Sequence, residues 1–248
     1  MFNQPVPAIT KNLLIINGLF FLAKIVFESR GINLDVYLAA FYPESVNFHW
    51  WQVITHMFMH ANFSHILFNM FALWMFGSVV EQTLGAKKFL ILYFLAGLGS
   101  FVLFNFTNYL QIEQLKPAVE SMGFNLTEIV NAKNPIEPNM YPSFGAGAPE
   151  SAKELLAYFT RPMVGASGAI YGVLVAFGVL YPEAKLALIF LPIPVKAKYF
   201  IPIMIALEFF LAIQNYAWNP IAHFAHIGGA IIGFILVKAW KKKLHREW

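Results

Sequence analysis

Apolar residues run along this chain in six long stretches, separated by segments that are richer in polar residues, proline and glycine. Stretches of about 17 to 24 apolar residues match the length of an α-helix that crosses the hydrocarbon core of a bilayer. Backbone groups inside lipid must form their hydrogen bonds within the segment, which favours helices. The pattern therefore predicts six membrane-spanning helices, at about residues 12–29, 60–82, 88–109, 166–182, 198–215 and 222–240.

The first external connection, residues 30–59, is unusually apolar for a loop. It contains Phe48, Trp50 and Trp51, and aromatic rings with a polar edge settle at the boundary between lipid and water. We expect this connection to lie in the membrane interface.

The connection at about residues 110–165 is different, because proline, glycine and acidic residues interrupt it repeatedly. This composition predicts an external insert in a chain whose residues 1–248 otherwise form a single membrane domain. Ser151 and Glu154 have the spacing of a capping box ahead of apolar residues, which predicts a short surface helix near residues 152–159.

Composition agrees with a membrane protein and excludes several other classes. Of the 248 residues, 58% are hydrophobic and 12% are charged, and the mean hydropathy is +0.59. Soluble domains carry about one quarter charged residues. The absence of cysteine excludes disulfides and thiolate metal sites. Lys11 leads directly into the first span without a small-residue cleavage site, so no cleavable signal peptide is expected.

The basic residues predict the orientation of the chain. Six spans place both ends on one side, and the basic residues of the ends and of the connections on that side are Lys11, Lys87, Lys88, Lys185, Lys196, Lys198, Lys238, Lys241, Lys242, Lys243 and Arg246. The positive-inside rule makes that side cytoplasmic, which predicts a multi-pass protein of the cell (inner) membrane with both termini in the cytoplasm. The closing basic run is then an orientation signal and no nucleic-acid site is expected.

Unusual polar residues occur near the external start of three predicted spans. His65 and Asn69 lie in the first turns of the second span, Ser167 begins the fourth, and His226 lies about one turn into the sixth. Because all three spans enter from outside, we expect these side chains at similar depth. Residues four apart share a helix face, so His65 lies on the same face as Asn69, and Ser167 lies on the same face as Tyr171. One site could hold them all.

Small residues provide for a close contact between the fourth and sixth spans. A serine among small residues is by default a packing residue, because Gly, Ala and Ser let membrane helices approach each other. The glycines at the required spacing are Gly168 and Gly172 on the fourth span and Gly229 and Gly233 on the sixth. Such a contact would bring Ser167 to His226.

A serine and a histidine in contact can perform nucleophilic catalysis. His226 Nε2 would accept the proton of Ser167, which makes the hydroxyl a nucleophile. Attack on an acyl group develops an oxyanion, for which His65, the Asn69 amide and the Ser167 backbone N–H are the expected donors.

These residues resemble the motifs of the rhomboid family of intramembrane serine proteases, in the six-helix form found in bacteria. The resemblance covers about residues 11–240 and rests on His65-x-x-x-Asn69, Gly165-x-Ser167-Gly168 with Tyr171, and Ala225-His226 with Gly229-x-x-x-Gly233.

The resemblance implies a catalytic dyad of Ser167 and His226, oxyanion stabilisation by His65 and Asn69, and Tyr171 packed against the base. It implies that the substrates are transmembrane proteins in the lipid bilayer, cut near its outer face at helix-destabilised segments. No cofactor and no metal are expected.

The sequence departs from the family pattern in two places. The family usually carries Trp-Arg in the first external loop, where this chain has Trp51-Gln52, which puts loop stability in question. The insert before Ser167 is also longer than a compact connection, and we expect it to tune substrate access. Residue 169 is Ala, so the serine does not lie in the Gly-x-Ser-x-Gly elbow of α/β-hydrolases.

Three other interpretations compete with a protease. Buried polar residues can mark the path of a channel or transporter, but the charges for such a path are missing. His56, His60 and His65 suggest a metal site, yet no carboxylate or thiolate accompanies them. A rhomboid-like protein that binds membrane clients without cutting them is the remaining alternative, although both dyad residues are present.

Glu208 is the only acidic residue that these predictions place deep in a span. An ionised carboxylate facing lipid there would cost at least about 2.5 kcal/mol, so the side chain is expected to face the bundle or to be protonated. About eleven residues into the fifth span, it is predicted near the midplane and below His226. The fifth helix of the family is thought to be a movable gate, so a structural or gating role is expected. His223 is interpreted as a residue of the rim.

Overall fold

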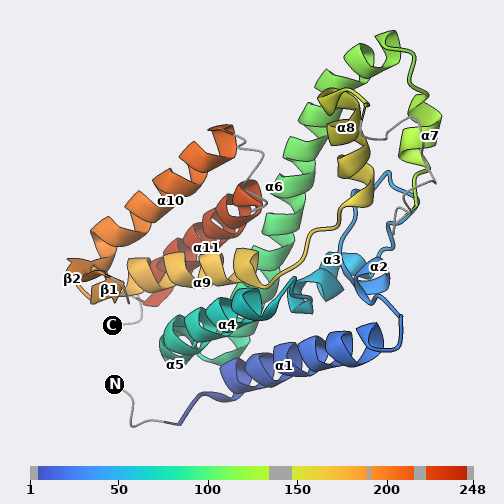
Figure 1. The fold of residues 1–248 in the computed structure, drawn as a ribbon. Coiled ribbons are helices and arrows are strands. Elements are labelled where there is room, and N and C mark those ends of the chain that lie inside the picture. The colour runs from blue at the N-terminus through green and yellow to red at the C-terminus, as the bar shows by residue number, and fades with distance from the viewer. Residues whose placement is uncertain (1–4, 134–146, 189–190, 215–221, 245–248) are drawn as a thin grey trace.

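The computed structural model describes residues 5–133, 147–188, 191–214 and 222–244, and within these ranges the chain is mostly helical (Figure 1). The helices before the middle of the chain are α1 (Ala8–Glu28), α2 (Asp35–Leu38), α3 (Gln52–Thr55), η1 (His56–Phe58), α4 (Phe63–Ala72), η2 (Leu73–Gly77), α5 (Ser78–Leu84), α6 (Ala86–Ser121) and α7 (Leu126–Val130). The later elements are α8 (Glu150–Thr160), α9 (Ser167–Leu180), β1 (Lys185–Leu188), β2 (Leu191–Lys196), α10 (Ala197–Gln214) and α11 (His223–Leu244).

The two strands form an antiparallel hairpin between α9 and α10, an element that the apolar pattern did not predict. The start of α1 and the end of α11 lie on the same side of the bundle as this hairpin (Figure 1). We call this side the hairpin end and the opposite side, where α9 and α11 begin, the pocket end.

The prediction of an all-α polytopic membrane bundle is confirmed. Among the described residues, five helices are long and apolar enough to cross a membrane: α1, the continuous stretch α4–η2–α5, α6, α10 and α11. The remaining predicted span is α9, with 14 residues. Each of the six predicted spans starts within four residues of the observed helix.

Helix α9 lies at the centre of the bundle and is apolar on all sides. Its buried residues run from Gly168 to Phe177 with a single interruption at Tyr171. At 1.5 Å per residue, α9 is about 21 Å long, shorter than the hydrocarbon core of about 30 Å. A helix that is hydrophobic on all sides is typical of a core. Helices α6 and α11 pack against α9 and cover it, whereas the outer spans have a face left for lipid.

Backbone atoms of α9 and α11 are in direct contact at their glycines. A Cβ atom added to Gly229 would lie 1.8 Å from the carbonyl oxygen of Gly168. One added to Gly233 would lie 2.3 Å from the carbonyl oxygen of Gly172. Real Cβ atoms do not approach backbone so closely, so only glycine allows this contact. We call it the glycine seam.

Helix α6 continues far beyond the predicted third span. It has 36 residues, which corresponds to about 54 Å, whereas the predicted span ended near residue 109. Its last turns carry a second hydrophobic core with α7 and α8, formed by Tyr42, Ile112, Val119, Ile129, Ala132, Ala152, Leu155, Leu156 and Phe159. The first part of the predicted insert is therefore helical and packed (Figure 1).

The short surface helix predicted near residues 152–159 is observed as α8. Its predicted cap is wrong, because Pro149 occupies the N-cap position and no side chain caps the helix. Ser151 lies inside the first turn, and its hydroxyl contacts the sulfur of Met122 at 3.9 Å. The prolines and glycine predicted to break the insert at positions 135, 138, 142 and 145 lie outside the described residues.

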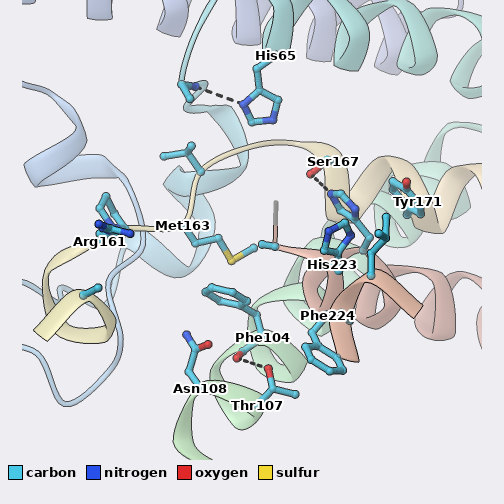
Figure 2. A pocket seen from close by; sticks show the side chains of 18 of the residues that line it. His65, Phe104, Thr107, Asn108, Arg161, Met163, Ser167, Tyr171, His223 and Phe224 are labelled. Carbon is cyan, nitrogen blue, oxygen red and sulfur yellow. Dashed lines mark hydrogen bonds between the residues drawn. The ribbon is translucent and has the colours of Figure 1, made fainter. Parts of the chain in front are cut away.

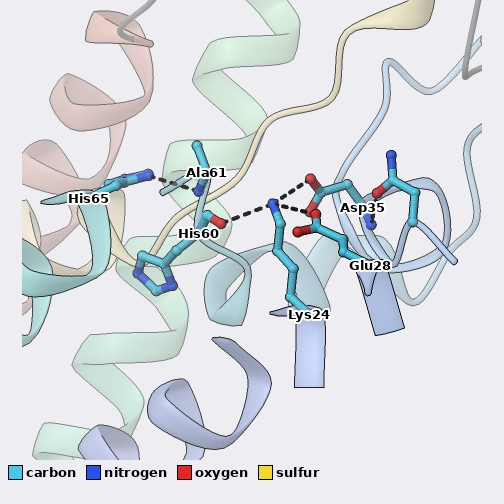
Figure 3. Close-up of polar contacts among 7 residues, drawn as sticks. Lys24, Glu28, Asp35, His60, Ala61 and His65 are labelled. Carbon is cyan, nitrogen blue, oxygen red and sulfur yellow. Dashed lines mark hydrogen bonds and ion pairs between the residues drawn. The ribbon is translucent and has the colours of Figure 1, made fainter. Parts of the chain in front are cut away.

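A buried lysine holds the first connection onto α1. Lys24 Nζ lies 2.6 Å from Asp35 Oδ2, 3.8 Å from Glu28 Oε1 and 3.1 Å from the His60 carbonyl oxygen (Figure 3). Its side chain is only 7% exposed. Because a buried ammonium group must be paired, this cluster fixes both ends of the loop that leads into α4.

A buried carboxylate organises the hairpin end in the same way. Glu81, at the end of the second span, accepts hydrogen bonds from the backbone N–H groups of Ile9 and Thr10 at 2.9 and 2.7 Å and from the Thr10 hydroxyl at 2.8 Å. These are free N–H groups of the first turn of α1, and a carboxylate there also complements the helix dipole.

Candidate active site

Ser167 is the first residue of α9, and a turn at Gly165 places it there. Gly165, two residues earlier, has φ +124°, which favours glycine. A Cβ atom at Gly165 would also lie 2.9 Å from the His65 ring. The Gly165 N–H donates to the His56 carbonyl at 2.9 Å, and this bond ties the turn to the first connection. Only glycine lets the chain pass His65 and begin α9 at Ser167.

The structure brings Ser167 and His226 into contact across the glycine seam. His226 Nε2 lies 2.9 Å from Ser167 Oγ (Figure 2). The Tyr171 ring, one turn further along α9, stacks on the His226 ring with centroids 4.2 Å apart and planes 5° from parallel. His226 is therefore fixed between a serine and an aromatic face of the same helix.

His65 and Asn69 border the same cavity from α4. His65 Nδ1 accepts a hydrogen bond from the Ala61 N–H at 3.4 Å, which leaves the proton of a neutral ring on Nε2 (Figure 2). Asn69 Nδ2 is buried and has no hydrogen-bond partner among the described residues. Among the described residues, both side chains thus offer donors without a protein acceptor, and the His65 ring faces the Gly165 turn.

The cavity that contains Ser167 has a volume of about 790 Å³. All five side chains predicted to form a site line it, namely His65, Asn69, Ser167, Tyr171 and His226. The other wall comes from α6 and α8, with Phe104, Thr107, Asn108, Glu154, Tyr158 and Arg161 (Figure 2). Arg161 is exposed, so the cavity reaches the molecular surface. Burial raises the pKa of Tyr158 to about 12, so this hydroxyl stays protonated.

Glu208 was expected below the level of His226, and the structure places its carboxylate within 3.0 Å of the His226 ring. Oε1 accepts a hydrogen bond from the Tyr171 hydroxyl. Oε2 lies 2.5 Å from His223 Nδ1 and 3.0 Å from His226 Nδ1. His223 is not on a solvated rim either, since its side chain is 7% exposed.

The difference in depth between Glu208 and His226 is small. Glu208 lies six residues before Gln214, the last described residue of α10 at the pocket end, and His226 lies three residues after the start of α11. At 1.5 Å per residue these depths differ by only about 4.5 Å, which a glutamate side chain and a helix tilt can span. The signal that could have revealed the pair was this distance from the nearer end.

Ligand atoms of Glu208, His223 and His226 all lie within 4.8 Å of one another, the distance range of a metal site. A tetrahedral zinc with bonds of about 2.0 to 2.1 Å separates its ligand atoms by about 3.3 Å. His223 Nδ1 and Glu208 Oε2 are 2.5 Å apart, which is a direct hydrogen-bond distance. The arrangement fits a hydrogen-bonded network better than a coordination sphere.

His56 and His60, which precede α4, are buried and neutral. His56 Nδ1 lies 2.8 Å from the Gln52 carbonyl oxygen. Neither ring nitrogen of His60 has a hydrogen-bond partner among the described residues. Burial lowers the pKa of each ring to about 4, so both remain uncharged at neutral pH. The structure does not bring His56, His60 and His65 together as a ligand group.

Comparison with known families agrees with this geometry. The model of the Rhomboid domain matches residues 47–125 and 136–242, well over half of the chain. The chain belongs to the rhomboid family. The match includes both sides of the cavity and every residue of the candidate site.

Several rhomboid proteins are similar along much of this chain. Rhomboid protease AarA of Providencia stuartii is 28% identical over 240 residues, which cover 94% of this chain and 72% of the relative. A mitochondrial rhomboid protein of Schizosaccharomyces pombe is 28% identical over 213 residues, 78% of this chain and 52% of the relative. Rhomboid protein 1, mitochondrial, of Saccharomyces cerevisiae is 27% identical over 199 residues, 79% of this chain and 44% of the relative. The chain thus spans about half the length of the two yeast relatives.

Gln52, where the resemblance to rhomboid proteins led us to expect arginine, holds the first connection together. Its Oε1 accepts from the N–H groups of His49 at 3.0 Å and Phe41 at 3.4 Å, and its Nε2 donates to the Asn47 carbonyl at 3.1 Å. The side chain is fully buried. An uncharged amide satisfies these backbone groups, so the structure gives no reason to expect an unstable loop.

Proposed function

We propose that this rhomboid is an intramembrane serine endopeptidase that hydrolyses peptide bonds in or near the transmembrane segments of other proteins. The observation that carries the proposal is the 2.9 Å contact between Ser167 Oγ and His226 Nε2 inside a cavity that borders the membrane-spanning helices. The relative from Providencia stuartii is named a rhomboid protease, which supports the same activity.

The reaction follows from the proton positions. Ser167 Oγ attacks the scissile carbonyl carbon while its proton passes to His226 Nε2, and the resulting imidazolium then protonates the leaving amine. Water attacks the acyl-enzyme in the second half, with His226 again accepting a proton and returning it to Ser167. The dyad ends each cycle in its starting state, and no cofactor or metal takes part.

The developing oxyanion would bind on the α4 side of the cavity. Within the described part of the chain, His65 Nε2–H and the Asn69 amide have no protein acceptor, and the Ser167 N–H lies at the free N-terminus of α9. Donors that are held in place before the reaction stabilise negative charge without reorganising. We assign His65, Asn69 and the Ser167 N–H to this role.

The lipid-facing surface and the charges suggest where the enzyme works. We propose that both termini lie in the cytoplasm and that the cavity lies on the outer side of the cell (inner) membrane. This orientation is supported by the basic residues at the hairpin end, such as Lys87, Lys88 and Lys185, because basic residues gather on the cytoplasmic side. Substrates there are transmembrane proteins whose helix is destabilised near a small residue. Nucleic acid is not a proposed partner.

The competing candidate is a rhomboid that binds membrane clients without cutting them, and covalent labelling separates the two. We expect a fluorophosphonate to label the purified wild-type protein at Ser167 and to leave Ser167→Ala unlabelled. The Ser78→Ala variant is a matched control, because Ser78 is a helical serine of the second span outside the cavity. Absence of labelling in folded wild-type protein, with intact client binding, would favour the non-proteolytic candidate.

Asn69→Ala is expected to lower the cleavage rate by about 10- to 1,000-fold, because it removes one oxyanion donor among several. The effect should fall on kcat, since the donor acts on charge that develops only in the transition state. Single-turnover cleavage of a single-span substrate measures it. A change of less than threefold would show that the buried amide does not contact the oxyanion.

A further inference from the structure

We propose that Glu208 is the positioning residue of His226, so that Ser167 and His226 of this rhomboid work in a Ser–His–Glu triad whose carboxylate orients the base. The inference rests on the proposed function and deepens it. It reverses the structural or gating role expected from the sequence, because the carboxylate lies at the site and not below it.

The first argument concerns the tautomer of His226. To accept the Ser167 proton, Nε2 must be unprotonated, so the single proton of the neutral ring must sit on Nδ1. Nδ1 is buried and has no aligned hydrogen-bond acceptor among the described residues. The nearest carboxylate oxygen, Glu208 Oε2, lies 3.0 Å away. Contacts of this kind often become aligned only when substrate is bound.

The second argument concerns charge. When Ser167 loses its proton to Nε2, the ring becomes an imidazolium and keeps its Nδ1 proton. Glu208 stays ionised and faces this new positive charge at 3.0 Å, in a site where its side chain is 12% exposed. Opposite charges attract more strongly in such surroundings than in water, so the carboxylate stabilises the state that forms during attack. No proton moves to Glu208.

The third argument concerns how the carboxylate is held. The Tyr171 hydroxyl donates to Oε1, and His223 Nδ1 lies 2.5 Å from Oε2. The same Tyr171 ring stacks on His226. Two side chains from α9 and α11 therefore fix a carboxylate of α10 beside the base, and a buried network of this kind orients each of its members.

The test compares Glu208→Gln with the wild type in detergent, using a single-span substrate and a fluorophosphonate. We expect kcat to fall by about 10²- to 10⁴-fold with KM within threefold, and labelling of Ser167 to slow in parallel, because an amide can donate to Nδ1 and favour the wrong tautomer. In the His226→Ala background the same substitution should cause no further loss. Glu81→Gln, which alters an equally buried carboxylate at the hairpin end, should lower thermal stability and leave kcat unchanged.

The outcomes distinguish this inference from the proposed function. If the wild type is active and the kcat of Glu208→Gln stays within threefold of it, the triad is overturned and the proposed function stands. A folded wild type that neither cleaves nor labels overturns both. If Glu208→Gln does not fold, the tautomer of His226 is measured by NMR in wild-type protein labelled with ¹⁵N-histidine. A proton on Nδ1 of His226 supports the triad, and a proton on Nε2 overturns it.

Discussion

The His226→Ala variant is expected to lose at least about 10⁴-fold in cleavage rate, and the double variant with Ser167→Ala is expected to be no slower than either single variant. Both side chains serve one proton transfer, so removing the second one after the first costs nothing more. The residual rate would come from substrate binding and from the oxyanion donors on α4. Single-turnover cleavage with excess enzyme measures all three variants.

His49→Ala is the matched control for this experiment. His49 stacks on Trp51 with ring centroids 4.5 Å apart and planes 5° from parallel, nearly the geometry of His226 on Tyr171. It is exposed in the first connection and lies outside the cavity, so its removal should leave the rate unchanged. A double variant markedly slower than both single variants would show that Ser167 and His226 act in separate steps.

The Gly229→Ala variant is expected to lose more than about 3 kcal/mol of stability and most of its activity. Overpacking a core costs about 1 to 3 kcal/mol where side chains can shift. Here the added Cβ atom would lie 1.8 Å from the carbonyl oxygen of Gly168, so the backbones of α9 and α11 must separate. That separation would also pull His226 away from Ser167.

Thermal unfolding in detergent and fluorophosphonate labelling measure the two losses. Gly18→Ala is the control, because a Cβ atom at Gly18 in α1 meets nothing within 4 Å. Alanine there should be neutral or slightly stabilising, as it is in helices generally. Equal melting temperatures for the two variants would contradict the view that the glycine seam holds Ser167 and His226 together.

Much of this architecture could be predicted from the sequence, because a bilayer imposes a length and a polarity on every span. The six apolar stretches matched helices for that reason. The contact of α9 with α11 could also be predicted, because glycines four residues apart, such as Gly229 and Gly233, let two membrane helices approach closely.

Other features depend on contacts that no local pattern contains. Helix α6 continues to Ser121 because residues 112 and 119 share a hydrophobic core with α7 and with α8, and α8 lies far along the sequence. Hydropathy predicts only the part of a helix that lies in lipid, whereas α6 continues beyond it. The contact of Glu208 with His226 was not predicted, because a residue count along α10 carries no information about tilt or about its neighbour on α11.

The shortness of α9 has a consequence for the supply of water. Its first residue begins below the level that a full-length span would reach, and the cavity of about 790 Å³ fills the space above Ser167. At about 30 Å³ for each molecule, that space has room for a few tens of waters. In the proposed reaction, water for acyl-enzyme hydrolysis would enter through this cavity, which reaches the molecular surface, and would not have to cross the surrounding lipid.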